Sequence, residues 1–318
     1  MSHFHWRVAA ASLLALTICS TAASAAKIKH VFVIAMENTD AEVTYKSVPG
    51  KDYIADLIAA YAHADDFVDE LQDKKDKVHG LDVPSEPHYI YMEAGTNAFS
   101  DHKFTTDSSP SATNSTKSTD HLVTQLTKKG LSWRTYQEVQ VTISAGSCLI
   151  HSLGHYAPKH NPFIFFQDIS GSPPQKSTDV CKAHIRPYSA FATDLANNDM
   201  ADYVFITSDL CHDMHDRCGN IGRNAAGNLW LKVEMPRLIA WAKAHDGVIF
   251  LTWDEGSATG KMPFLAIGAH VKPHYAGAIL YDHGSMLLSI ERIFDLHPLP
   301  AVKGKNDLAD LFESGYFP

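Results

Sequence analysis

The chain has 318 residues and a formal net charge of −9, from 27 basic and 36 acidic side chains. This length allows one large α/β domain or two smaller ones, and an apolar content of 45% is enough for a sizeable core. The negative charge argues against a nucleic-acid partner, because such binding depends on basic side chains that neutralise phosphates. It also argues against strong adhesion to anionic membranes.

The first 25 residues have the pattern of a secretory signal peptide. Arg7 supplies the positive charge, Val8 to Ile18 the apolar stretch, and Ala23-Ser24-Ala25 a cleavage site of small residues. The apolar stretch is too short to span a bilayer comfortably, which disfavours a membrane anchor and predicts no stable membrane insertion. The expected product is secreted or periplasmic, is cleaved after Ala25, and carries 26 basic against 36 acidic side chains, a net charge of −10.

Four cysteines remain once Cys19 leaves with the signal: Cys148, Cys181, Cys211 and Cys218. An even number in an oxidising compartment predicts disulfides, and four cysteines allow three pairings. The favoured pairing is Cys211–Cys218 with Cys148–Cys181. The alternative is a metal site with soft ligands, for which the spacing is poor.

Apolar strand patterns alternate with helical ones along the chain. The predicted strands cover residues 31–36, 64–67, 131–138, 203–209, 247–255 and 263–267. The predicted helices cover 51–62, 85–94, 120–129, 188–197, 229–245 and 283–296, and 308–317 closes the chain. Residues 69–79 are predicted as a charged surface segment, 100–119 as a surface loop, and 144–187 as an insertion over the site.

Local signals mark where several of these helices begin, break and end. Ser85 is a plausible N-cap, Gly95 suits a helix end, and Asp120 is expected to cap the next helix. Pro236 is expected to break the helix over 229–245. The alternation predicts an α/β fold, a three-layer α/β/α sandwich around a mostly parallel sheet. No convincing linker is present, so residues 26–318 are predicted to form a single catalytic domain.

Three apolar strands end in potential ligands. The run Val31–Met36 leads into Glu37 and Asn38, and 247–253 leads into Asp254 and Glu255. A third strand, 203–209, precedes a His/Asp-rich segment with Asp213 and His215. In open α/β sheets the carboxyl ends of the strands carry the chemistry. We therefore expect these side chains to meet at one edge of the sheet.

These residues suggest a metal-assisted site with a serine nucleophile. Glu37, Asn38, Asp254 and Glu255 form a hard oxygen set suited to Mg²⁺, Ca²⁺ or Mn²⁺. Asp213, His215 and His283 form a mixed set suited to Zn²⁺ or iron, or to a phosphate and leaving-group clamp. Ser85 at a helix N-terminus faces free N–H groups that favour an anion, and a nearby metal would make its hydroxyl nucleophilic. The alternatives are plain capping for Ser85 and hydrogen-bonded structural roles for the others.

Seven motifs in this order resemble the phosphoesterase family of secreted acid phosphatases and phosphatidylcholine-type phospholipases C, in the alkaline-phosphatase-like superfamily. They are Val33-Ile-Ala-Met-Glu37-Asn38, Pro84-Ser85-Glu86-Pro87-His88-Tyr89 with Gly95, Ser132-Trp133-Arg-Thr-Tyr136-Gln-Glu138, Lys159-His160-Asn161-Pro162-Phe163, Asp213-Met-His215-Asp216, Thr252-Trp-Asp254-Glu255, and His283-Gly-Ser285 with Ile290-Glu291. The resemblance implies an alkaline-phosphatase-like fold and covers most of the chain after the predicted signal.

The resemblance also implies roles for individual residues. Glu37, Asn38, Asp254 and Glu255 would hold a divalent metal ion (Mg, Ca, Mn or Zn). Ser85 would attack phosphorus and form a phosphoserine, and Asp213, His215 and His283 would form a second metal site or a clamp. His160 would bind a phosphate oxygen or act as general acid, and His88 stands where the family usually has an asparagine that binds phosphate. Glu255 replaces a usual histidine, which favours a harder cation.

The implied function is a secreted, metal-dependent phosphomonoesterase of acid phosphatase type, acting on phosphate esters that include phosphoinositides. One alternative is a phospholipase C that cleaves phospholipid head groups. An alternative of another class is an inactive protein that binds phosphate. The expected partner is a phosphate-ester small molecule or a phospholipid head group, with no nucleic acid, and the sequence leaves the oligomeric state open.

Overall fold

The computed structural model describes residues 1, 3, 28–71, 83–139, 148–175, 178–256 and 260–318. The predicted signal peptide lies outside these described residues, apart from positions 1 and 3. So do most of the predicted charged segment 69–79 and residues 144–147 and 176–177 of the predicted insertion. Within the described ranges, no helix has both the length and the apolar character that crossing a bilayer requires.

The centre of the molecule is an eight-stranded mixed sheet with the order β4-β3-β5-β1-β6-β7-β2-β8. The strands are β1 (His30–Met36), β2 (Ala62–Ala64), β3 (Trp133–Gln137), β4 (Ile185–Pro187), β5 (Tyr203–Thr207), β6 (Gly247–Trp253), β7 (Phe264–Gly268) and β8 (Tyr275–Gly277). Strands β4, β3, β5, β1 and β6 run parallel, whereas β7 is antiparallel to both β6 and β2. The mostly parallel sheet is as predicted.

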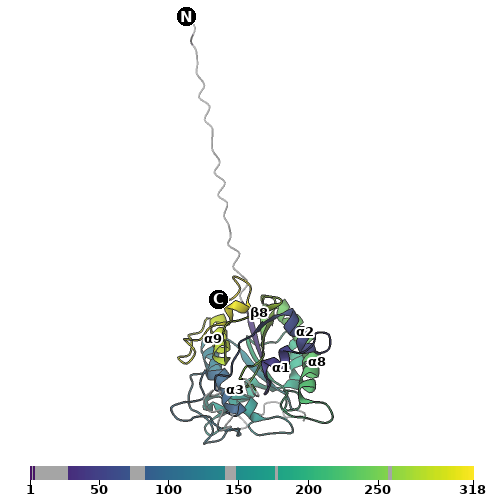
Figure 1. Cartoon of the computed structure of the whole chain (residues 1–318). Coiled ribbons are helices and arrows are strands. Elements are labelled where there is room, and N and C mark those ends of the chain that lie inside the picture. The colour runs from purple at the N-terminus through teal and green to yellow at the C-terminus, as the bar shows by residue number, and fades with distance from the viewer. Residues whose placement is uncertain (2, 4–27, 72–82, 140–147, 176–177, 257–259) are drawn as a thin grey trace.

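Helices cover both faces of this sheet, as Figure 1 shows. One side carries α1 (Ala41–Tyr45), α2 (Tyr53–Ala60) and α8 (Arg223–Ala244), and the other carries α3 (Ser85–Ala94) and α9 (His283–Ile293). The remaining helices are α4 (Leu122–Lys129), α5 (Gln167–Ser170), α6 (Asp179–His184), α7 (Phe191–Ala196), η1 (Pro158–His160), η2 (Pro162–Phe165), η3 (Tyr188–Ala190) and η4 (Leu308–Leu311). The predicted three-layer α/β/α sandwich is confirmed.

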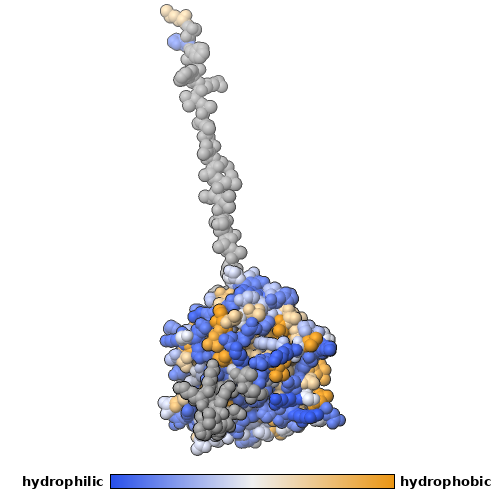
Figure 2. Space-filling model, viewed as in Figure 1, coloured by the Kyte–Doolittle hydropathy of each residue, from blue (hydrophilic) through white to orange (hydrophobic). Residues whose placement is uncertain are grey.

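The central strands are apolar because neither of their faces meets water. All residues of β5, β6 and β7 are buried, and in β1 only His30 is partly exposed. A continuous apolar run is typical of a parallel strand that is covered on both sides, whereas a half-exposed strand alternates. In Figure 2, by contrast, hydrophilic residues dominate the visible face and hydrophobic residues form scattered patches.

Helix α8 differs from its prediction in length and continuity. It begins at Arg223, six residues earlier than expected, and continues through Pro236 to Ala244 without the expected break. Proline removes one hydrogen bond to the carbonyl four residues earlier. Both Pro236 and Lys232 are exposed, so water can reach the freed carbonyl, and the helix remains continuous.

Several predicted boundaries also shift. Ser85 is the first residue of α3 rather than its N-cap, which is Pro84, while Gly95 ends the helix at φ +69° as expected. Asp120 does not cap α4, whose N-cap position is His121. Strand β2 covers 62–64 instead of 64–67.

Both favoured disulfides are present. Cys148 pairs with Cys181, and Cys211 pairs with Cys218 across a Cα–Cα distance of 5.4 Å. The second disulfide closes the loop that carries Asp213 and His215. It therefore constrains two of the predicted site residues.

Candidate active site

The carboxyl ends of β1 and β6 meet at one edge of the sheet, as predicted. The Asp254 backbone N–H donates to the Met36 carbonyl at 2.9 Å, and the Asn38 N–H donates to Asp254 Oδ1 at 3.0 Å. The Glu37 N–H donates to the Asp213 carbonyl at 2.7 Å, which ties in the segment after β5. Asn38 has a positive φ of +24°, a region that asparagine tolerates better than most residues. Three separate stretches of chain are thus joined at this edge, and we call the group around Glu37, Asp213 and Asp254 the rim.

Ser85 lies at this rim, at the start of α3. Its Oγ is 3.2 Å from Glu37 Oε2 and 3.3 Å from Glu255 Oε1, so its hydroxyl can donate to either carboxylate. The side chain is only 2% exposed. The structure therefore brings the predicted nucleophile together with two of the predicted metal ligands, although they are 48 and 170 residues apart.

One turn further along α3, His88 forms a buried pair with Asp69. Its Nε2 is 2.9 Å from Asp69 Oδ1, and its Nδ1 is 3.0 Å from the Pro84 carbonyl. Ligand atoms of Asp69, His88 and Glu255 lie within 4.8 Å of one another. The sequence prediction missed Asp69, which it placed in a charged surface segment, whereas the residue is only 5% exposed. Its position just after the buried Phe67 was the available signal.

His160, on η1, approaches the rim from the segment between β3 and β4. Its Nε2 is 2.8 Å from Glu37 Oε1, its Nδ1 is 3.5 Å from Asp213 Oδ2, and its ring stacks on Tyr89. The preceding residue, Lys159, pairs with Asp107 at 2.6 Å. Sequence reasoning did not single out Lys159 for a role, although it is the neighbour of a predicted site histidine.

His283 is the first residue of α9, and a capping box fixes the start of this helix. The Asp282 side chain accepts from the Ser285 N–H, and the Ser285 hydroxyl lies near the Asp282 N–H in return. This geometry places His283 Nε2 2.8 Å from the Asp254 carbonyl oxygen. His283 is fully buried, and this contact places it against the β6 end of the rim, as predicted.

His215 is partly exposed, and its backbone and its ring have different hydrogen-bond partners. Its backbone N–H donates to Asp213 Oδ1 at 2.8 Å, while its ring Nδ1 is 2.7 Å from Asp216 Oδ1. The imidazole thus faces Asp216 rather than Asp213. The compact three-ligand group beside Ser85 is Asp69, His88 and Glu255, which is a combination that the sequence did not predict.

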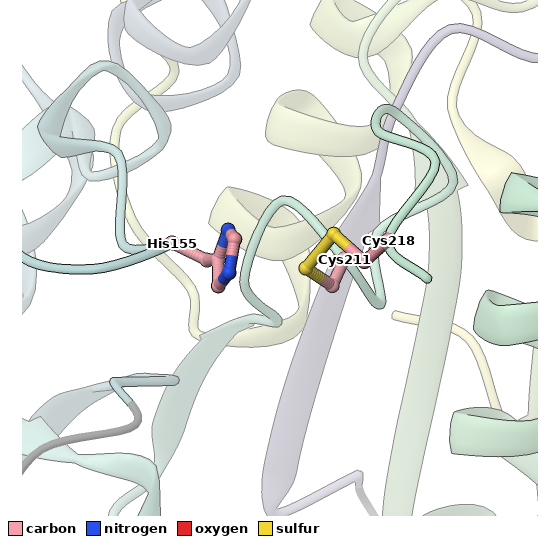
Figure 3. A group of neighbouring side chains, drawn as sticks. All are labelled: His155, Cys211 and Cys218. Atoms are coloured by element: carbon pink, nitrogen blue, oxygen red, sulfur yellow. A yellow bond between two sulfur atoms is a disulfide. The ribbon is translucent and has the colours of Figure 1, made fainter. Parts of the chain in front are cut away.

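The loop between Cys211 and Cys218 holds Asp213 in place. Met214, in this loop, has φ +81°, a left-handed conformation that is unfavourable for a residue with a long side chain. Figure 3 shows the disulfide of Cys211 and Cys218 with His155 beside it. Because both sulfurs are bonded to each other, this His/Cys group offers no thiolate, and the soft-ligand alternative fails for these two cysteines.

Crowded buried carboxyl groups dominate the electrostatics of the rim. Burial raises the pKa of Glu37, and burial together with the charge of Glu37 raises the pKa of Asp213 and Asp254. Burial and the charge of Asp254 raise the pKa of Glu255 to about 8. Burial and like charges both oppose ionisation of these groups, and a bound cation would favour it.

The histidines of the rim divide into two kinds. Burial lowers the pKa of His160, and it lowers the pKa of His283 to about 4, so both are neutral and retain a lone pair for a ligand. Burial also opposes the charge on His88. There the hydrogen bond and the charge of Asp69 outweigh burial and raise the pKa to about 10. His88 is therefore a cation next to Ser85.

The donor set fits a divalent cation. Asp213 Oδ2, Asp254 Oδ2 and His283 Nδ1 are buried and have no hydrogen-bond partner in the structure. Buried acceptors are normally satisfied, so such atoms call for an explanation. An ion bound by carboxylate oxygens and imidazole nitrogen would satisfy them and reduce the repulsion among the carboxylates.

A cavity of about 470 Å³ opens onto this rim. Its lining consists of Asn38, Val83, Pro84, Ser85, Asp107, His215, Arg223, Glu255 and Gly256. This volume lies within the range of small-molecule sites, roughly 300–1,000 Å³. Ser85 is thus accessible to a small ligand even though most of its surface is covered.

Comparisons with known proteins agree with the motifs. A family model described as "Phosphoesterase family" matches residues 73–297. A phosphatidylinositol-3-phosphatase of Mycobacterium tuberculosis is 29% identical over 67% of this chain and 63% of its own length. A probable acid phosphatase of Kluyveromyces lactis is 26% identical over 90% of this chain and 63% of its own length. The chain therefore spans less than two thirds of the length of these relatives.

Solved structures share the fold at low sequence identity. A murine ectonucleotide pyrophosphatase/phosphodiesterase 5 superposes with a TM-score of 0.56 at 9% identity, covering 90% of this chain and 100% of that one. A Vibrio parahaemolyticus protein of the alkaline phosphatase superfamily gives 0.54 at 11% identity, covering 89% and 70%. The predicted alkaline-phosphatase-like fold is confirmed.

Proposed function

The chain belongs to the Phosphoesterase family, and from this we propose that it is a phosphomonoesterase of acid phosphatase type. The observation that carries the proposal is the position of Ser85 Oγ, which lies 3.2 Å from Glu37 and 3.3 Å from Glu255 in a residue that lines an open cavity. The names of both relatives, a phosphatidylinositol-3-phosphatase and a probable acid phosphatase, support phosphate monoesters as substrates, with phosphoinositides among them.

The catalytic serine would be Ser85, which attacks phosphorus and forms a phosphoserine that water then hydrolyses. Its hydroxyl proton would pass to Glu37 or Glu255, the two carboxylates within hydrogen-bond distance. At the N-terminus of α3, the Ser85 backbone N–H would donate to a phosphate oxygen, whereas the Glu86 N–H already donates to Asp107 Oδ1 and Pro87 has no N–H. His88, a cation paired with Asp69, would add positive charge to this anion site.

A divalent metal ion would be held by Glu37, Asn38, Asp254 and Glu255, with Asp213 and His283 around a second position. When bound, such an ion supplies positive charge that lowers the pKa of the serine hydroxyl and stabilises the phosphate oxygens. His160 would orient the phosphate group, and His215 would protonate the leaving alcohol. His215 suits the second task, because it lines the cavity.

We also propose the wider setting that the sequence predicts. Residues 26–318 would work as one catalytic domain, and residues 1–25 would direct the protein out of the cytoplasm. The two disulfides support an oxidising compartment, since disulfides are rare where thiols are kept reduced.

The direct test is Ser85→Ala. Hydrolysis of p-nitrophenyl phosphate should fall more than about a thousandfold, because the nucleophile is lost, while the melting temperature stays close to that of the wild type. Acid quenching of the wild type with radiolabelled substrate should trap label on Ser85, and the variant should trap none. Ser100→Ala, at an exposed position away from the rim, is the matched control. Turnover by Ser85→Ala close to the wild-type rate would eliminate the proposed mechanism.

The substrate class is tested separately. We expect hydrolysis of a simple phosphomonoester and of a phosphoinositide monophosphate, each measured with and without chelator. Release of phosphocholine from phosphatidylcholine at a comparable rate would instead assign the protein to the phospholipase C reading. No phosphate release from any monoester would refute the phosphatase.

A further inference from the structure

The cavity beside Ser85 is lined by a positively charged side chain, Arg223, that the proposed chemistry does not use. Arg223 is the first residue of α8, and it lines the same cavity as Ser85 and His215. The residue is exposed, so its guanidinium is accessible to solvent. It was not among the residues that the sequence suggested for the site.

The other titratable side chains that line this cavity are already engaged, and Glu255 among them lies 3.3 Å from Ser85 Oγ. Asp107 is 2.6 Å from the ammonium group of Lys159, and the ring of His215 is 2.7 Å from Asp216. Arg223, in contrast, has neither an ion pair nor a side-chain hydrogen bond among the interactions of the described residues. The first turn of α8 contains no acidic side chain that could neutralise it.

The charge of Arg223 is therefore available to a ligand. A guanidinium is planar and always charged, and its fork of N–H donors matches the two oxygens of a carboxylate or a phosphate. At about 470 Å³, the cavity has room for more than the phosphate group that would react at Ser85. A substrate whose alcohol portion carries its own negative charge can thus contact both residues.

We propose that Arg223 is a specificity-determining residue that binds a second anionic group, a carboxylate or a further phosphate, on the alcohol portion of the substrate. This inference rests on the proposed phosphomonoesterase function and names the substrate class of that site: phosphomonoesters whose alcohol portion carries a second anionic group. Arg223 does not take part in bond cleavage. Its contribution is to substrate binding and orientation.

The test uses pairs of substrates that differ in the second charge. Glycerol 3-phosphate has a hydroxymethyl group where 3-phosphoglycerate has a carboxylate. Fructose 1,6-bisphosphate has one phosphate group more than fructose 6-phosphate. In at least one pair, we expect the wild type to prefer the member with the second anionic group. The pair that shows this preference identifies whether Arg223 binds a carboxylate or a phosphate. Initial phosphate release by the full chain gives kcat/KM for each substrate.

Arg223→Gln should lower kcat/KM for the preferred substrate with two anionic groups by about five- to tenfold, mainly through KM. For the partner substrate with one phosphate group, kcat/KM should stay within twofold of the wild-type value. Arg223→Lys should retain part of the preference, because the charge remains while the fork is lost. Added salt should weaken the preference, since an exposed charge is screened. Lys232→Gln removes one charge from the exposed surface of the same helix, outside the cavity lining, and should change none of these values.

The outcomes separate this inference from the function on which it rests. If Arg223→Gln hydrolyses all four substrates as the wild type does, or loses activity equally on both members of each pair, the specificity role is refuted while the phosphatase stands. The same holds if the wild type shows no preference for a second charge. If the wild type hydrolyses none of the four, nor p-nitrophenyl phosphate, the phosphatase itself fails, and the role of Arg223 with it.

Discussion

Individual buried charges in this protein are held by partners from distant segments. Away from the active site, His121 lies between two carboxylates: its Nδ1 is 2.8 Å from Glu93 Oε1, and its Nε2 is 3.1 Å from Asp168 Oδ2. Burial opposes the charge on His121, but the hydrogen bonds to Asp168 and Glu93 outweigh it and raise the pKa to about 9. The imidazolium thus links α3, α4 and α5.

This pKa determines how His121 affects stability as the pH changes. A group whose pKa is higher in the folded than in the unfolded protein stabilises the fold fully below its unfolded value, here 6.5, and stops doing so as the pH rises through about 9. His121→Gln should therefore lower the free energy of unfolding most at pH 6, by about 3 kcal/mol, and progressively less up to pH 9. Urea unfolding of both proteins between pH 6 and 9.5 measures this difference.

The difference in free energy of unfolding between the two proteins should shrink as the pH rises, and this decrease separates a charge effect from lost packing. A difference that stays constant over the whole range would show that His121 contributes only its volume. His102→Gln is a useful control, because His102 is a surface-loop histidine whose ring contacts Asn114 rather than a carboxylate.

At the scale of elements, the loop carrying Asp213 is pressed against α8. Gly227 of α8 has no side chain where the loop approaches most closely. A Cβ at this position would lie 2.5 Å from Met214 Cγ and 2.9 Å from the His212 carbonyl oxygen. Met214 is the residue held at φ +81°, so the disulfide on one side and α8 on the other maintain an unfavourable backbone conformation.

Gly227→Ala should therefore damage the site although alanine favours helices. The added methyl group would displace the backbone at His212, and with it Asp213, so we expect kcat for p-nitrophenyl phosphate to fall at least about tenfold. The melting temperature should fall by less than the steric cost alone would cause, because a gain in helix propensity of about 1 kcal/mol offsets part of that cost. Steady-state kinetics and thermal melts measure the two effects.

Ala240→Gly provides the matched control on the exposed face of the same helix. It should lower the melting temperature through helix propensity alone and leave kcat unchanged. Unaltered kinetics in Gly227→Ala would show that the loop does not depend on its contact with α8.

At the scale of the whole molecule, the sheet gathers several buried carboxyl groups at one edge, where burial opposes their ionisation. Glu37, Asp213, Asp254 and Glu255 all have raised pKa values there, with burial as the largest cause. Such a site costs stability in the absence of a cation, which is common where function requires the groups. A bound cation would recover part of this cost.

A divalent metal should consequently stabilise the fold as well as activate it. At a hundredfold excess over its dissociation constant, an ion that binds only the folded state adds about 2.7 kcal/mol, which corresponds to a rise of about 5 °C in melting temperature. We expect this shift on adding Mg²⁺, Ca²⁺, Mn²⁺ or Zn²⁺ to chelator-treated protein, measured by calorimetry. The effective ion should also restore activity.

Glu37→Gln should show a much smaller thermal shift, because one of the ligands loses its charge. Activity and melting temperature that are both insensitive to chelator and to added ions would contradict the metal assignment. The serine mechanism would then still be open to its own test.

The strand ends could be predicted well because local sequence encodes them. The apolar runs of β1, β5 and β6 are buried on both faces, and the potential ligands that follow them can be read directly from the sequence. The short-range disulfide Cys211–Cys218 was predictable for a similar reason. The predictions that Asp120 caps a helix and that Pro236 breaks one were wrong, because the surroundings of a helix can outweigh a single local preference, whereas Gly95 ends α3 as expected.

The sequence by itself determined the fold class, since strands buried on both sides must be apolar throughout and the helices between them make the connections parallel. It also determined which residue types are delivered to the sheet edge. Only the tertiary structure decided that Asp69 joins His88, that the ring of His215 faces Asp216, and that Arg223 lines the cavity. These contacts join segments that local pattern does not relate, because side-chain pairing across a fold depends on how whole elements pack rather than on the residues adjacent in the chain.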